Sequence, residues 1–270
     1  MEDKKTTLAA SIEREQSSSE NVAAEQPKNL SASIEKSRAK KKSYLMDLRI
    51  HSPASLGYLG IEGIDTAPAL VRLAKVKGLD VIAVTDFYSA AYIDRVIDAA
   101  RNTSLIVIPG VDLRVTLKNC DDVILSCLFP ESSNAQAIHD FLRALGVPSA
   151  AMGNRKYLVS HPFDHVLSII DEFGAVALPS RMDKTPHRLA VLPQLVETYG
   201  FRAFDLAYAD SVSIFRSRWP KIKFQLFSFS NANALAQVGS RMARVKMPDP
   251  GFAGIKHLVA RQSAESSPAR

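Results

Sequence analysis

The sequence predicts an α/β fold with a mostly parallel sheet that is buried on both faces. Three observations favour this class. Short apolar runs rich in Val, Ile, Leu and Ala alternate with amphipathic segments of helical period. The runs are apolar almost throughout, as in strands covered on both sides. The chain has 270 residues and is 46% hydrophobic, enough for one large core. The pattern alone leaves both an open sheet and a closed barrel in play.

The first β-α-β unit has clear boundaries. Residues 44–50 read as a strand. Residues 66–78 read as a helix, with Thr66 as N-cap and Gly78 as the C-terminal stop. Residues 80–86 then read as a second buried strand.

The middle of the chain continues the alternation with more strands in succession. Ser133 and Ser160 are the expected caps of its second and third helices. The predicted elements are a helix at 90–102, strands at 104–110, 111–117 and 122–129, and helices at 133–146 and 160–174.

The last part repeats the same pattern, with Pro193 expected to interrupt a helix because proline lacks the N–H that a helix needs. The predicted elements are strands at 175–180, 201–209 and 221–230, a helix at 185–200, and a short helix at 232–239.

The chain divides into a folded domain at 43–261 and two end segments. Residues 1–42 are rich in Ser, Glu, Lys and Ala and have no aromatic residue, so we expect a disordered tail. The tail carries two similar stretches, LAASIER from Leu8 and LSASIEK from Leu30, which are either twin docking segments or chance similarity. Residues 262–270 are expected to be frayed.

Composition excludes several classes of protein. No apolar run is long enough to span a membrane, and the N-terminus lacks the apolar core of a secretory signal. Cys120 and Cys127 match no metal or redox spacing and fit a reducing, cytoplasmic setting. The net charge of +6 weakly favours acidic partners, and the basic cluster at 37–43 leaves non-specific nucleic-acid contact open.

Polar side chains gather where the predicted strands end. In parallel α/β folds, these carboxyl ends form the functional face. If the sheet closes into a barrel, the residues converge on one mouth that is poor in histidine and rich in guanidinium groups. They are Arg49, His51, Thr85, Asp86, Asp112, Arg114, Ser180, Arg181, Ser230, Asn231 and Asn233.

Several ordered motifs carry a resemblance to a known family. They are DLRIHSPAS, GLDVIAVTDFYSA, IVIPGVDLRV, CLFP, GAVALPSRMDK and FSFSNANALAQVG. Together they resemble the PHP (polymerase and histidinol phosphatase) family over residues 44–247, nearest to its bacterial stand-alone branch. The resemblance implies a distorted (βα)7 barrel whose mouth holds two or three divalent metals for phosphoester hydrolysis.

The chain departs from that family at nearly every metal-ligand position. The first motif resembles D-x-H-x-H and keeps only its second histidine, His51. The second resembles T-D-H and keeps Asp86, and the bridging glutamate is the shorter Asp112. The other departures are Arg49, Phe87, Ile124 and Arg181 in place of histidines, and Ser230, Asn231, Ala232 and Asn233 in place of S-D-A-H.

These replacements predict that the multi-metal centre is lost. Amides are weaker ligands than carboxylate or imidazole. An arginine about 5 Å from a divalent cation costs about 6–7 kcal/mol at an effective dielectric constant of about 20. We expect no cofactor, or at most one weakly held Mn, Fe or Zn ion.

Two interpretations of the vacated mouth remain open. In one, Arg49 and Arg181 neutralise Asp86 and Asp112 and fill the pocket with ion pairs. In the other, Arg49, Arg114 and Arg181, with Asn231 and Asn233, bind a phosphate through forked hydrogen bonds. A bound phosphate favours the second interpretation, and a mouth closed by Arg–Asp pairs favours the first.

The sequence therefore predicts a non-catalytic regulatory, scaffolding or anion-binding subunit, with a protein partner on the tail or a phosphate-bearing small molecule as ligand. One alternative is a residual metal-dependent phosphoesterase that uses His51, Asp86 and Asp112. Another is a nucleic-acid accessory protein.

His161 and His165 lie one helical turn apart, a zinc-compatible spacing, but no third ligand is evident.

Overall fold

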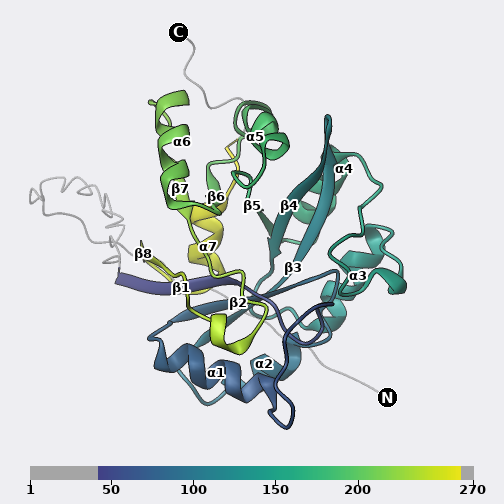
Figure 1. The fold of residues 1–270 in the computed structure, drawn as a ribbon, viewed down its shortest axis with the longest axis vertical. Helices are drawn as coiled ribbons and strands as arrows, with labels where there is room; N and C mark the ends of the chain where they lie inside the picture. The colour runs from purple at the N-terminus through teal and green to yellow at the C-terminus, as the bar shows by residue number, and fades with distance from the viewer. Residues whose placement is uncertain (1–41, 263–270) are drawn as a thin grey trace, which may run out of the picture. The chain divides into compact units, whose positions relative to one another are not determined.

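The eight strands form one sheet that curls into a barrel. A computed structural model describes residues 42–262, so the predictions for the N-terminal tail, its paired ASIE segments and residues 263–270 lie outside the described residues. The strand order is β7-β6-β5-β4-β3-β2-β1-β8 (Figure 1). The strands are β1 (Lys42–Ile50), β2 (Val81–Phe87), β3 (Ile106–Leu117), β4 (Cys120–Leu128), β5 (Val176–Ser180), β6 (Ala203–Asp205), β7 (Gln225–Phe227) and β8 (Ala243–Met247).

The chain that follows β7 closes the ring against β1. Ile50 forms a parallel bridge with Ala232, and the His51 N–H donates to the Ala232 carbonyl at 2.9 Å. The buried Asp47 carboxylate strengthens the seam, because it accepts the N–H groups of Ser230 at 3.1 Å and Gly239 at 3.0 Å. The predicted distorted α/β barrel is confirmed, with β8 as an extra antiparallel strand on β1.

The sheet is parallel except around β4 and β8. β4 runs antiparallel to both β3 and β5. The reason is the short connection at residues 118–119, since a parallel crossover needs a dozen or more residues. Lys118 has a φ of 52°, as a tight hairpin turn requires. Residues 104–110 and 111–117, predicted as two strands, are parts of the single strand β3.

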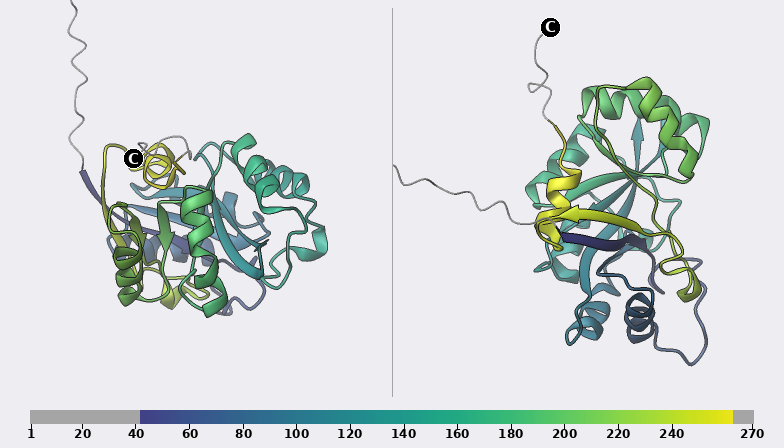
Figure 2. Two further views of the ribbon diagram at one scale, coloured as in Figure 1. Left: turned by 90° about the horizontal axis from the view of Figure 1, so that it is seen from above. Right: turned by 90° about the vertical axis from the view of Figure 1, so that its left-hand side faces the viewer.

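Within residues 42–262, six α-helices lie outside the barrel, and α7 lies at one end of it, close to β8 (Figures 1 and 2). The described helices are α1 (Thr66–Val76), α2 (Ile93–Ala100), α3 (Ala135–Ala144), α4 (Phe163–Glu172), α5 (Pro186–Pro193), α6 (Val212–Arg218) and α7 (Phe252–Val259). None of them is long and apolar enough to cross a membrane. The sequence pattern did not reveal α6, β8 or α7.

The helix caps differ from the predicted ones by one residue or more. Asp65, not Thr66, caps α1, and Asn134, not Ser133, caps α3, each through a side-chain oxygen that accepts a backbone N–H. Ser160 does not cap α4, which follows Pro162 without a side-chain cap. Asp and Asn satisfy free N–H groups as well as serine does, so composition alone could not choose between neighbours. Pro193 ends α5 as predicted, and one π-helical turn follows.

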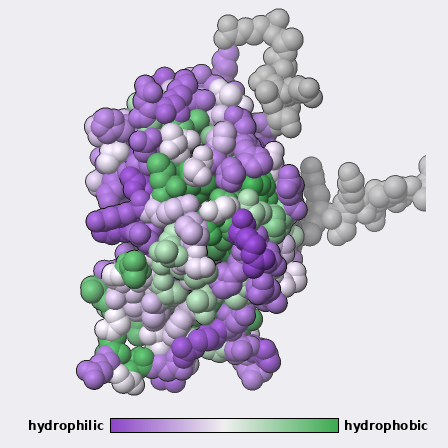
Figure 3. Space-filling view, turned by 90° about the vertical axis from the view of Figure 1, so that its right-hand side faces the viewer, coloured by the Kyte–Doolittle hydropathy of each residue, from purple (hydrophilic) through white to green (hydrophobic). Residues whose placement is uncertain are grey.

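Two hydrophobic clusters hold the fold. The larger one lies between the strands and the surrounding helices and includes Phe141, Phe204 and Phe215. The smaller one fills the end of the barrel opposite the mouth, where Phe252 and Ile255 of α7 pack among strand side chains. On the face shown in Figure 3, hydrophobic residues show between broad hydrophilic areas. Because the smaller cluster fills the α7 end and charged side chains gather at the other end, the interior of the barrel is apolar at the α7 end and polar at the mouth.

Candidate functional site

A polar pocket of about 320 Å³ opens at the barrel mouth, where the strands end. The structure brings together most of the side chains predicted for this place. Arg49, His51, Arg114, Arg181, Asn231 and Asn233 line the pocket, together with Phe87 and Ile124. Asp86 and Asp112 lie beneath it and are fully buried. Ser230 does not line the pocket, and its backbone N–H donates to Asp47 where the barrel closes.

Arg49 lies at the centre of the barrel. It comes from the end of β1 and is only 2% exposed. Its Nε and Nη2 donate to Asp112 Oδ2 at 3.0 and 2.8 Å. Its Nη1 is 3.6 Å from Asp205 Oδ2, an ion pair without a hydrogen bond. One guanidinium therefore bridges two buried carboxylates, from β3 and β6.

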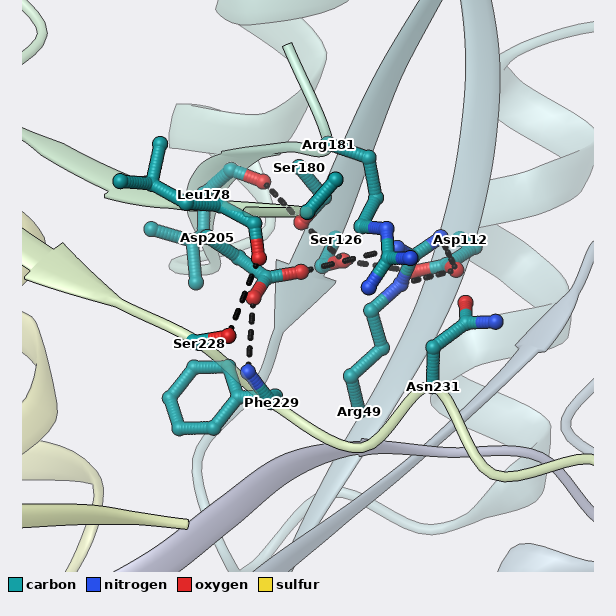
Figure 4. Close-up of polar contacts among 12 residues, drawn as sticks. Arg49, Asp112, Ser126, Leu178, Ser180, Arg181, Asp205, Ser228, Phe229 and Asn231 are labelled. Atoms are coloured by element: carbon teal, nitrogen blue, oxygen red, sulfur yellow. Dashed lines mark hydrogen bonds and ion pairs between the residues drawn. The ribbon is translucent and has the colours of Figure 1, made fainter. Parts of the chain in front are cut away.

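Asp112 belongs to a wider hydrogen-bond network. Its second oxygen, Oδ1, accepts from the Ser126 hydroxyl of β4 at 2.6 Å. Ser126 in turn lies 2.9 Å from the hydroxyl of Ser180 on β5 (Figure 4). Because both carboxylate oxygens have protein donors, Asp112 is anchored in place.

Asp86 has other partners than those predicted for it. No arginine pairs with it among the described residues. Its Oδ1 accepts from the Ser52 N–H at 2.7 Å and the Ser55 hydroxyl at 2.6 Å, and its Oδ2 accepts from the Ser52 hydroxyl at 2.5 Å. Burial raises the pKa of Asp86 to about 6, although these donors oppose the rise. The Asp86 ion pair of the first interpretation does not form, because the loop after β1 folds its serines back onto Asp86.

His51 is a buried ring in surroundings that favour its neutral form. It is 2% exposed and stacks on Phe87, with ring centroids 5.6 Å apart and an interplanar angle of 10°. Burial lowers its pKa, and the nearby Arg49 lowers it further, while Asp112 opposes them. Its Nε2 lies 3.4 Å from the Asn231 amide oxygen and 4.0 Å from Asp112 Oδ2. These surroundings therefore favour an uncharged imidazole at pH 7 and above.

Arg181 extends from the end of β5 toward Arg49, between Asp112 and Asp205 (Figure 4). Its backbone has a φ of 57°, which an L residue adopts only when its surroundings hold it there. Burial lowers the pKa of its guanidinium, which Asp205 opposes and Arg49 reinforces. Among the described residues, no carboxylate lies within salt-bridge distance of the Arg181 side chain. The guanidinium groups of Arg49 and Arg181 thus lie close together, and Arg181 interacts with Asp205 only beyond salt-bridge distance.

The rim carries further basic groups. Asp122 on β4 pairs with Arg114 at 2.9 Å and with Arg188 at 2.8 Å. Arg155, Lys156 and Lys184 complete the basic lining, and Asp122 is the one acidic residue among the described lining residues.

Sequence reasoning missed several residues of the site. Asp205 lies in a strand of only three residues, and its carboxylate was not weighed. Ser126 was hidden inside an apolar run on a strand whose direction was unknown. The signal available for Asp205 was a lone carboxylate in an otherwise apolar strand, because a buried charge calls for a partner.

The remaining motifs have ordinary environments. The His161 and His165 rings meet edge to face at 4.7 Å, with no third ligand among the described residues. Both cysteines are buried, and burial raises the pKa of the Cys127 thiol well above its usual range.

The residues at the mouth do not fit the metal centre that the resemblance implies. Arg49 donates to Asp112 Oδ2 and Ser126 to its Oδ1, and Ser52 and Ser55 donate to the oxygens of Asp86, so the oxygens that a cation would need are occupied. Within residues 42–262, no group of three or more His, Cys, Asp or Glu side chains is placed to hold one metal ion.

The comparisons with known proteins support the fold alone. No family model and no curated protein matches the chain. The lesion-specific endonuclease PfuEndoQ from Pyrococcus furiosus has a TM-score of 0.60 and 15% identity, over 84% of this chain and 57% of its own. An endonuclease Q complex with a duplex substrate has a TM-score of 0.57 and 16% identity, over 82% and 58%.

PsfC from Pseudomonas syringae has a TM-score of 0.50 and 15% identity, over 82% of this chain and 89% of its own. By contrast, this chain spans less than three fifths of the length of the two endonuclease Q chains. The shared feature is the distorted barrel.

Proposed function

We propose that this protein is a degenerate PHP-type barrel whose mouth binds a phosphate-bearing ligand without hydrolysing it. One observation carries the proposal: the buried Arg49 guanidinium lies between Asp112 and Asp205, where a metal ion would need their oxygens, beneath a pocket lined mainly by basic side chains. An arginine cannot lose its proton to become a metal ligand, and it repels a cation placed beside it.

The charge of the pocket supports an anionic ligand. Its lining residues include Arg49, Arg114, Arg155, Lys156, Arg181, Lys184 and Arg188, against Asp122 alone. The basic groups still outnumber the acidic ones when the buried Asp86, Asp112 and Asp205 are counted. Guanidinium groups bind phosphate oxygens in pairs, and Arg181 lines the pocket without a carboxylate at salt-bridge distance among the described residues. The Arg–Asp pairs at the base leave the mouth open, with a volume of about 320 Å³.

The same contacts weigh against the residual phosphoesterase that would use His51, Asp86 and Asp112. Hydrolysis by such a site needs a metal to activate water. The two carboxylates already accept hydrogen bonds from arginine or serine donors. A regulatory or scaffolding role follows from binding without turnover, and a partner on the N-terminal tail remains part of this proposal.

The first test is anion binding by titration calorimetry at low salt, with inorganic phosphate, pyrophosphate and a short single-stranded oligonucleotide as probes. We expect phosphate or pyrophosphate to bind, and Arg181→Ala with Lys184→Ala to weaken binding about tenfold or more. The control is Arg101→Ala, because Arg101 is exposed, pairs with Asp98 and does not line the pocket. No binding of any probe, or equal weakening by the control, contradicts the proposal. A preference for the oligonucleotide favours the nucleic-acid alternative.

The second test is metal content, measured by plasma mass spectrometry on protein purified with Mn, Fe and Zn available and without chelators. We expect clearly less than one equivalent and no metal-stimulated release of phosphate from a phosphoester. A full equivalent that is lost in His51→Ala, Asp86→Ala or Asp112→Ala favours the phosphoesterase instead.

A further inference from the structure

A second basic cleft lies away from the mouth, beside β7, β8 and α7. It has a volume of about 700 Å³. Its described lining residues include Arg202, Lys223, Arg244, Lys246 and His257, and none of them is acidic. It shares no lining residue with the pocket at the mouth.

The cleft lies between the two ends of the sheet. β7 and β8 are the terminal strands, so each is hydrogen-bonded to one neighbouring strand in the described structure. All of β7 and all of β8 line the cleft. The bridge between Ile50 and Ala232 closes the barrel nearer the mouth, whereas β7 and β8 leave it open here. A free strand edge presents unpaired N–H and C=O groups to an added strand.

The side chains of β8 alternate in a way that defines a partner strand. Arg244 and Lys246 are exposed and point to one face. Ala243 and Val245 point to the other face, where they pack against the cluster that α7 completes. β8 lies alongside β1 on its other edge, next to α7 (Figure 2).

We infer that this cleft binds an extended acidic segment of a partner protein, which adds as a strand to the free edge of β8. The charge of the cleft selects acidic residues, and the alternation on β8 places them at every second position, opposite Arg244 and Lys246. Small apolar residues occupy the positions between them, beside Ala243 and Val245. The proposal is independent of anion binding at the mouth.

Two observations favour a peptide over nucleic acid. Single-stranded nucleic acids bind on aromatic side chains that stack with the bases. Among the described lining residues of the cleft, the one Phe, Tyr or Trp side chain is Phe227, and it is only 5% exposed. Sheet edges bind peptides through backbone hydrogen bonds, which the sugar–phosphate backbone cannot continue as a ladder.

The test measures fluorescence anisotropy of labelled peptides with the full-length protein at low salt. The probe is a short peptide that alternates Glu and Val. Its controls are a peptide of the same composition with the glutamates contiguous, an alternating peptide with N-methyl groups on the bonding edge, and a single-stranded dT oligonucleotide. We expect the alternating peptide to bind at least about tenfold more tightly than either peptide control. We also expect slower exchange of alternate β8 amide protons in its presence.

Variants locate the contact. Arg244→Glu with Lys246→Glu is expected to abolish binding, whereas Lys221→Glu, an exposed lysine outside the cleft, leaves most of it. Equal binding of all three peptides overturns strand addition, because net charge alone then explains the contact. Tighter binding of the oligonucleotide overturns the peptide proposal. No binding at all means that Arg244 and Lys246 only guard a sheet edge against aggregation, and the inference is wrong.

Discussion

Removing the Arg49 guanidinium tests how strongly it stabilises the centre of the barrel. Arg49→Met keeps most of the side-chain length but leaves Asp112 and Asp205 without their shared cation. The Nη2–Oδ2 contact to Asp112 is 2.8 Å and fully buried. Breaking a buried ion pair by removing one partner costs about 3–5 kcal/mol, because a charge is left unpaired in a poor solvent. We expect a loss of that size, a large part of the stability of an ordinary domain.

The loss also depends on pH, with a defined sign. Burial raises the pKa of Asp205 to about 6, and Arg49 is the group that most opposes this rise. A carboxyl with a folded-state pKa above its unfolded value favours the folded state less as the pH rises through that pKa. Without Arg49 the pKa of Asp205 rises further. The difference in unfolding free energy between the wild type and Arg49→Met therefore grows as the pH rises above about 6.

The assay is urea unfolding followed by circular dichroism at pH 5.5 and at pH 8. Arg101→Met, which breaks an exposed pair, serves as control and is expected to cost less than about 0.5 kcal/mol. Arg49→Met combined with Asp112→Asn is expected to recover about 2 kcal/mol or more, because one orphaned charge is removed. A loss below about 1 kcal/mol that is the same at both pH values refutes the reasoning, since the carboxylates would then be well solvated.

Three further predictions concern the loop after β1 and its anchor. Burial raises the pKa of Asp86 from 3.8 to about 6, so its contribution to stability is present at low pH and is lost as the pH rises through about 6. Asp86→Asn should flatten that part of the pH–stability curve in urea unfolding, and an unchanged slope contradicts the shift. Ser55→Ala removes the 2.6 Å donor to Asp86 and should cost about 1–3 kcal/mol, whereas the exposed Ser217→Ala should cost almost nothing. Gly153 has a φ of 73°, and a Cβ there would lie 2.4 Å from the Ala54 carbonyl oxygen. Gly153→Ala should therefore lower the melting temperature. An unchanged melting temperature means that the loop relaxes freely.

The barrel and much of its mouth could be predicted from sequence because both depend on local pattern. Arg49, His51 and Arg181 stand at the ends of apolar strands, and parallel strands bring such ends together. The antiparallel course of β4 was also readable in principle, since residues 118–119 are too few for a crossover. Strand direction matters to the site, because it is the reversed β4 that presents Ser126 to Asp112.

The pairing inside the mouth could not be predicted. Two arginines and two carboxylates permit several pairings, and the one adopted depends on tertiary distances. Asp86 takes serine donors from its own neighbourhood, while Arg49 turns to Asp112 and to the unforeseen Asp205. α6, β8 and α7 escaped prediction for another reason: they are short, and their apolar residues are fixed by contacts with the finished barrel rather than by their own period.

The arrangement of charge explains how such a barrel remains folded with an arginine at its centre. A cation there must be desolvated, and it is tolerated because Asp112 and Asp205 lie on either side of it. The two carboxylates carry two negative charges against the single positive charge of Arg49, and Asp205 also favours the charged form of the neighbouring Arg181 guanidinium. These four groups are balanced in charge, and the positive charge of the open pocket above them comes from other basic lining residues such as Arg155, Lys156 and Lys184. Filling the base with ion pairs and binding an anion above it are thus compatible, because the basic residues of the rim supply the surplus positive charge.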